Sequence, residues 1–202
     1  MEQHSNLTDP FQKIYQAIVD DPANRQFTQQ CIKPLYYAGA QARILLIAQA
    51  PGQRAQQQGM FWNDRSGVRL RDWLGLSWDE FYHSGKVAIM PMDFYFPGNS
   101  PHGDLPPRPD FAAKWHPQLL DLMPNIQLTI LIGAYASRAY LHLDKKIALT
   151  QIVRHYQDYL PQYFPIVHPS PRNRIWMSRN PWFEKTVLPD LQKRVAAIMA
   201  TD

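Results

Sequence analysis

Two segments of the sequence carry side chains that could hold a planar base and stabilise negative charge on it. The first runs from a Pro-Gly turn to an aromatic pair and two polar residues, namely Ala50, Pro51, Gly52, Phe61, Trp62, Asn63 and Asp64. A Pro-Gly turn lets a ligand approach the backbone, and an aromatic ring offers a stacking face. The second segment begins at His168, which can donate a hydrogen bond to a carbonyl oxygen and stabilise an anion there.

The second segment, IVHPSPRNRIW over residues 166–176, also has the charge of a surface that meets phosphates. Pro169 and Pro171 exclude a helix interior, so we predict a rigid loop at the end of a strand. Three arginines and no acidic residue follow the histidine before residue 180: Arg172, Arg174 and Arg179. With Trp176 among them and a formal net charge of +4, the segment favours nucleic acid, although a solvated basic loop has the same composition.

Alternating apolar and amphipathic segments indicate the elements that position these residues. Buried strands are predicted over 43–49, 86–92, 127–133 and 163–168. Helices are predicted over 9–20, 66–77, 108–124 and 135–143 and from Phe183 to Ile198, with Asp9 and Ser66 as N-caps and Val68 facing inward. Strands that alternate with helices predict an α/β fold: three αβα layers around a four-stranded parallel sheet, as a single domain over 1–202.

Ligands of such folds bind beyond the carboxyl ends of the strands. Three long loops start there, at 48–67, 93–109 and 168–176, and long ordered loops in a compact domain are usually functional. We therefore predict that these loops meet at one mouth, with Trp62 and His168 on the same side of the domain.

Composition excludes several other classes of protein. Cys31 is the single cysteine, so the chain can form neither an intramolecular disulfide nor an all-cysteine metal or iron–sulfur site. The spacing of His102, Asp104 and His116 matches no ordered set of metal ligands, and no metal or other cofactor is expected. No apolar run is long enough for a membrane span and the N-terminus lacks a signal pattern, so we expect a cytoplasmic monomer without membrane contact.

Three motifs, in this order and each at a strand end, resemble those of the uracil-DNA glycosylase superfamily over roughly residues 43–185. HPSPRN (168–173) is similar to the second motif of the single-strand-selective monofunctional class. APG (50–52) followed by Gly59 and Trp62 is similar to the first motif of the thermostable iron–sulfur class, as is FPGN (96–99). The resemblance implies a uracil-DNA glycosylase-like fold and a DNA glycosylase of base-excision repair, with DNA as its partner.

The resemblance also implies a role for each motif residue. Trp62 would stack on a flipped base, and His168 would steady the oxygen of the departing base. The residues that would grip phosphates or lie against the minor groove are Ser170, Arg172, Asn173, Arg174 and Trp176. Gln49 and Ala50 occupy the positions of water-handling residues. For Phe61 a core position is favoured over a stacking role, and Asp64 could act in catalysis or merely cap a turn or pair with Arg65 or Arg69.

The departures from the family pattern raise a second hypothesis. Ala50 and Ala55 stand where relatives carry water-handling polar or acidic residues, and the four cysteines of the iron–sulfur class are absent. The alternative to an enzyme is therefore a non-catalytic module that binds nucleic acid or a free base on the same fold.

A further departure concerns the choice of base. The family's uracil-reading asparagine is missing from IMPMDFYF (89–96), where the nearest polar side chain is Asp93. A carboxylate accepts hydrogen bonds but does not donate them, so in the pocket Asp93 would oppose O4 of uracil. The sequence predicts poor activity on uracil if Asp93 faces the pocket, and leaves uracil open if Asp93 points elsewhere.

Overall fold

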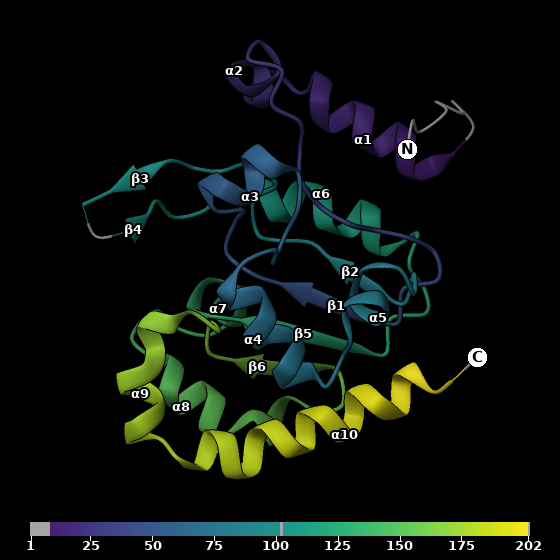
Figure 1. Ribbon diagram of the computed structural model, residues 1–202. Coiled ribbons are helices and arrows are strands. Elements are labelled where there is room, and N and C mark those ends of the chain that lie inside the picture. Colours follow the sequence, from purple (N-terminus) through teal and green to yellow (C-terminus); the bar gives the residue numbers. More distant parts are fainter. Residues whose placement is uncertain (1–8, 102, 202) are drawn as a thin grey trace.

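The middle layer of the protein is a sheet of four parallel strands. The computed structural model, which describes residues 9–101 and 103–201, orders them β2-β1-β5-β6 (Figure 1). Their bounds are Ile44–Ile47 for β1, Val87–Ile89 for β2, Leu128–Ile132 for β5 and Tyr163–Ile166 for β6. Each strand lies within a segment predicted as a strand, and each pairing is parallel because a helical connection joins successive strands.

Helices cover both faces of this sheet. Because successive strand residues point to opposite faces, Ile44 and Leu46 join one apolar core while Leu45 and Ile47 join the other. The first core is closed by α4 (Arg65–Leu74), α5 (Trp78–Tyr82), α8 (Leu149–Arg154), a π-helical turn (Phe183–Val187) and α10 (Leu188–Met199). The second is closed by α1 (Pro10–Asp20), α2 (Arg25–Thr28), α6 (Phe111–Leu120) and α7 (Ala134–Tyr140). The predicted three-layer αβα fold is confirmed.

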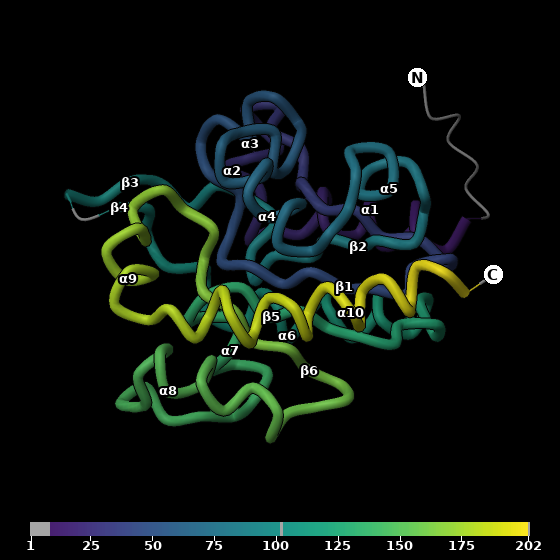
Figure 2. Tube along the Cα trace, turned by 60° about the horizontal axis from the view of Figure 1, so that its bottom comes forward, coloured from purple at the N-terminus to yellow at the C-terminus, as the bar shows by residue number. Residues whose placement is uncertain are grey.

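Short elements that the sequence patterns did not predict lie in the connections. They are α3 (Gln53–Gln58), α9 (Arg174–Arg179), the hairpin of β3 (Asn99–Ser100) and β4 (Gly103–Asp104), and the 3₁₀ turns Pro22–Asn24, Tyr156–Tyr159 and Pro171–Asn173. Figures 1 and 2 both show the hairpin and α9 projecting from the same end of the molecule. The arrow of β1 points to this end in Figure 1, so this is the carboxyl edge of the sheet.

The start of α4 differs from the prediction. Ser66 was expected to be the N-cap, but the helix begins at Arg65 and the carboxylate of Asp64 accepts from the backbone N–H of Gly67 (2.9 Å). Val68, expected to face inward, is 52% exposed because it lies two positions before the buried Leu70, which puts it on the opposite side of the helix. The N-cap of α1 is Asp9, as predicted, accepting from the backbone N–H of Phe11.

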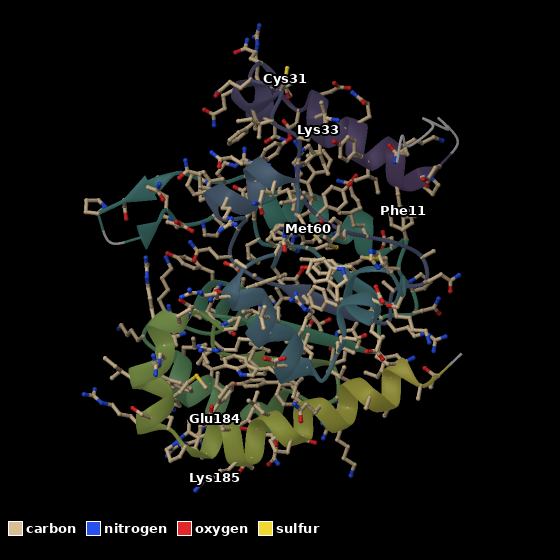
Figure 3. All side chains as sticks on the ribbon, in the orientation of Figure 1. Phe11, Cys31, Lys33, Met60, Glu184 and Lys185 are labelled. Atoms are coloured by element: carbon tan, nitrogen blue, oxygen red, sulfur yellow. The ribbon has the colours of Figure 1, made fainter. Side chains whose placement is uncertain are left out.

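Other expectations concern the surface and possible metal sites. Within the described ranges, no helix is long and apolar enough to cross a membrane, and no cluster of three potential metal-ligating side chains occurs. His102 lies outside the described residues. Cys31 is exposed and lies beside α2, at the top of the view in Figure 3.

Candidate functional site

A cavity of about 510 Å³ opens at the carboxyl edge of the sheet. Its volume falls within the range of about 300–1,000 Å³ that is typical of small-molecule sites. Of the residues predicted for the site, its wall includes Gln49, Ala50, Gly52, Phe61, Trp62, Asn63, Asp64, His168 and Arg172. The loops after β1, β2 and β6 therefore meet at one mouth, as expected for loops that start at the carboxyl ends of parallel strands.

Trp62 is held in the wall by an unusual backbone turn. Its φ of 57° lies in the left-handed region, which is costly for a tryptophan, so the surroundings must enforce it. The carbonyl of Trp62 turns onto α4 and accepts from Nη1 of Arg71 (3.1 Å). A Cβ at Gly67 would lie 1.6 Å from that carbonyl oxygen, so only glycine fits beneath the turn. The aromatic ring is thus fixed by the first turns of α4.

His168 faces Trp62 with ring centroids 5.4 Å apart and ring planes 41° apart. The backbone N–H of Ser170 donates to Nδ1 of His168 (3.1 Å), which places the imidazole proton on Nε2 when the ring is neutral. Asn173 donates from Nδ2 to the carbonyl of His168 (2.7 Å) and fixes the backbone. Within the described part of the chain Nε2 has no hydrogen-bond partner, so it is available to a ligand as a donor.

The electrostatics of the cavity favour this neutral ring. Burial lowers the pKa of His168, while the negative charges of Asp64 and Asp104 oppose that shift. The net direction is downward, so the imidazole stays neutral to a lower pH than an exposed histidine would. A neutral imidazole that carries its proton on Nε2 can donate a hydrogen bond to a developing oxyanion, so the ring does not have to be positively charged to stabilise it.

The two carboxylates that act on His168 come from different loops. Asp64 lies in the wall, as predicted, and also caps α4. Asp104, at the end of β4, was considered only as a possible metal ligand, yet its side chain lines the cavity beside Gly52. Sequence spacing could not have indicated it, because 40 residues separate Asp104 from Asp64.

Some residues of the motif after β1 line the cavity, and others are buried and only support the backbone. Gln49 donates from Nε2 to the backbone carbonyl of Leu105 (2.8 Å), a contact absent from the sequence prediction. Pro51 is buried and does not line the cavity, so it shapes the turn without facing a ligand. Phe61 lines the cavity but is only 4% exposed and packs edge-on against Tyr37, so it is largely a core residue.

Asp93 is not in the cavity, which corrects its assignment as a substrate-binding residue. Its carboxylate is fully buried on the other side of the sheet and pairs with Arg108 through Nε (2.7 Å) and Nη2 (2.8 Å). It also accepts from the backbone N–H groups of Tyr95 and Arg108. Because these contacts occupy both oxygens, the argument against uracil that rested on Asp93 fails.

The predicted DNA-binding segment also needs one correction. Trp176 points into the first core, donates from Nε1 to Oγ1 of Thr150 (2.7 Å) and packs edge-on against Phe183, so it is not presented to a partner. The exposed apolar side chain of α9 is Ile175, at 66%. The helical turn of α9 places residues 175 and 176 on different faces, which a loop prediction could not foresee.

The other residues of this segment have structural or surface positions. Ser170 caps the 3₁₀ turn by accepting from the backbone N–H of Arg172 (3.2 Å), and its carbonyl accepts from Arg69. Arg172 and Arg174 are exposed, and Arg172 also lines the cavity. Arg54 of α3 supplies a further cation to the wall that the sequence analysis did not name. Arg54 and Arg172 therefore bring positive charge to the mouth of the cavity.

Met60 completes the wall between α3 and the aromatic pair. In Figure 3 it lies in the middle of the molecule, well below Cys31 and Lys33, which mark the surface near α2. The cavity therefore has an apolar interior made by Met60, Phe61 and Trp62 and a polar, charged rim.

A second and larger cavity of about 900 Å³ lies between α6, α7 and the loop before α6. Its wall contains His116, but both ring nitrogens of that residue are already used, by the carbonyl of Pro91 and the hydroxyl of Tyr140. The smaller cavity is the better candidate for chemistry because its histidine keeps a nitrogen for a ligand. In a comparison with protein families, residues 35–192, more than half of the chain, match the family model described as Uracil DNA glycosylase superfamily.

Proposed function

Because this chain belongs to the uracil DNA glycosylase superfamily, we propose that it is a monofunctional DNA glycosylase that binds an extrahelical base in the 510 Å³ cavity and hydrolyses its N-glycosidic bond. Members of the superfamily act on DNA, and the choice of base belongs to this proposal. The observation that carries it is the facing pair of Trp62 and His168, with Nε2 of His168 left as a donor inside the cavity.

Each wall residue has a part in the proposed reaction. The indole of Trp62 offers the stacking face for the flipped base. Nε2–H of His168 donates to the base oxygen on which negative charge grows as the bond to the sugar breaks. Positive charge develops on the sugar at the same time, and the carboxylates of Asp64 and Asp104 stabilise it. No lysine lines the described wall, so the mechanism includes no Schiff base.

The rim suits a DNA strand. Arg54 and Arg172 stand at the mouth, where they can contact the phosphates beside the flipped nucleotide. Ile175 is exposed one turn further along, and apolar side chains of this size fill the gap that a flipped base leaves in the stack. Arg174, exposed on the same helix, is the remaining phosphate contact that we assign here.

The second candidate function is a binding module without hydrolysis. The observation in its favour is that Ala50 and Ala55, at positions of water-handling residues in relatives, carry no group that can orient water. The two functions share the cavity and the DNA contacts, so only a cleavage measurement separates them.

The decisive experiment is a panel of oligonucleotides that carry uracil, deaminated purines or modified pyrimidines, each single and double stranded. We expect cleavage of at least one base, with uracil as the first to test because Asp93 does not face the cavity. His168→Ala is the control for contaminating activity. Tight binding to an abasic duplex without cleavage of any substrate would favour the binding module.

A further inference from the structure

We propose that Asp104 is the carboxylate that orients and deprotonates the attacking water, in place of the groups missing at Ala50 and Ala55. The proposal rests on the glycosylase function above and names a residue that lies outside all three motifs. Three sets of contacts support it: those that hold the hairpin, those that tie the hairpin to the first motif, and those of the carboxylate itself.

The hairpin that carries Asp104 is held by its own hydrogen bonds. Asp104 pairs with Asn99 across the two short strands, and the Oγ of Ser100 donates to the carbonyl of Gly103 (2.8 Å). The backbone N–H of Leu105 donates to the carbonyl of Gly98 (2.9 Å) and closes the base of the hairpin. Asp104 therefore sits on a defined strand and not on a loose loop.

The first motif anchors this hairpin over the cavity. Gln49 donates from its amide nitrogen to the carbonyl of Leu105 (2.8 Å), the residue directly after Asp104. A glutamine can make this contact with a carbonyl, whereas the ionised glutamate found in some relatives cannot donate. Gln49 is thus a positioning residue. A glutamine at position 49, in place of glutamate, supplies no carboxylate itself but helps to hold the carboxylate of Asp104 over the cavity.

The side chain of Asp104 has the surroundings that the role requires. It lines the cavity, and its Oδ2 lies 3.9 Å from the place where a Cβ on Gly52 would be, so the carboxylate reaches over the Pro-Gly turn. Its charge acts on His168 across the cavity. In the described chain no hydrogen bond to its carboxylate is found, whereas an oxygen of Asp64 is engaged by the backbone N–H of Gly67. Of the two carboxylates, Asp104 is therefore the one with both oxygens available to water, whereas Asp64 keeps one.

The step balances as a hydrolysis. The water oxygen bonds to C1′ of the sugar while the bond between C1′ and the base nitrogen breaks. The electron pair of that bond leaves with the base, whose oxygen is stabilised by Nε2–H of His168. One proton of the water passes to Asp104, and the base anion later takes up a proton from solvent, so no further reactant is needed.

The test compares Asp104→Asn with Asp121→Asn, which removes an exposed carboxylate at the end of α6. Single-turnover cleavage is measured on the substrate found with the panel, and binding on the same duplex with a hydrolysis-resistant 2′-fluoro nucleotide. Loss of a general base typically costs about 10²–10⁴ in rate. We expect a loss of at least 10²-fold for Asp104→Asn, with binding unchanged or tighter because a negative charge near DNA is gone, and no loss for Asp121→Asn.

Two further measurements keep the outcome clear. Asp104→Glu should retain part of the rate, and Asp104→Asn should lower the pKa of His168 in an NMR titration because a neighbouring negative charge is removed. Cleavage by Asp104→Asn within about threefold of the wild type would overturn this inference and leave the glycosylase function intact. A wild type that binds the duplex but cleaves no base would overturn the proposed function and this inference with it.

Discussion

His168 lies on the loop after β6 at the carboxyl edge of the sheet, whereas His116 lies on α6, and the difference between them shows what makes a site. Burial lowers the pKa of both, that of His116 to about 4. His116 uses both ring nitrogens, donating to the carbonyl of Pro91 and accepting from the hydroxyl of Tyr140, so it has no capacity for a ligand. His168 uses Nδ1 alone and lines a cavity with Nε2 available. A perturbed pKa marks both residues, but only one is placed to act.

Asp93 and Asp104 differ in the same way as the two histidines. Asp93 is buried and saturated by Arg108 and two backbone N–H groups, as a structural ion pair must be. Asp104 lines the smaller cavity with its carboxylate exposed. Behind the sheet, Asp93 and His116 have their polar atoms occupied by protein partners, while at the carboxyl edge His168 and Asp104 keep polar atoms that face a cavity.

The largest expected effect is on the histidine of the cavity. His168→Ala should reduce the single-turnover rate on a verified substrate by about 10²–10³, since it removes one preorganised donor to the oxyanion. The free energy of unfolding should fall by about 1–3 kcal/mol, because the N–H of Ser170 loses its acceptor, so the rate is compared per folded molecule. A rate equal to that of the wild type would remove His168 from the mechanism.

The ion pair behind the sheet should show the opposite behaviour. Asp93→Asn leaves Arg108 without its counter-charge among the rings of Phe27, Tyr95 and Phe111. Breaking a buried pair costs about 3–5 kcal/mol, and the Arg108 side chain is 26% exposed, so we expect about 2–3 kcal/mol in urea unfolding.

The matched control is Asp190→Asn, which breaks the more exposed ion pair between Arg194 and Asp190. We expect it to lower the free energy of unfolding by about 0.5 kcal/mol or less. Equal losses for the two variants would contradict the distinction. The cleavage rate per folded molecule should stay unchanged in both.

The pH dependence of stability should come in part from His116. Its pKa is about 4 in the folded protein and about 6.5 when unfolded, so between these values the unfolded chain binds a proton that the folded chain does not. Its contribution is complete above pH 6.5 and is lost as the pH falls toward 4, by roughly 2 kcal/mol between pH 7 and 5. His116→Gln, which can still donate to Pro91 and accept from Tyr140, should flatten this part of the profile measured by urea unfolding. An identical slope in the variant would contradict the assignment.

The smallest effect concerns the cationic rim. Each phosphate contact releases counterions, so Arg54→Ala and Arg172→Ala should each lower the salt slope of DNA binding by about one unit. Lys185→Ala is the control, since Figure 3 places this residue at the bottom of the view, on the π-helical turn before α10. If the control changed the slope as much as the rim variants, the mouth of the cavity would not be the DNA-binding surface.

The sequence by itself determined the layers, the edge of the sheet that holds the site, and the pairing of Trp62 with His168. These follow from short-range patterns: apolar strands of three to five residues, amphipathic helices, and loops that must emerge at the carboxyl ends of parallel strands. The motif resemblance to the superfamily is confirmed by the family match over residues 35–192.

Only the tertiary structure decided which side chains reach the cavity. Asp93 turns away because Arg108, 15 residues further on, offers a buried bidentate partner, and Trp176 turns into the core because α9 is a helix. Asp104 reaches the cavity because a hairpin of two-residue strands folds back over Gly52 and is tied down by Gln49. Such directions depend on partners distant in the chain, and local periodicity carries no information about them.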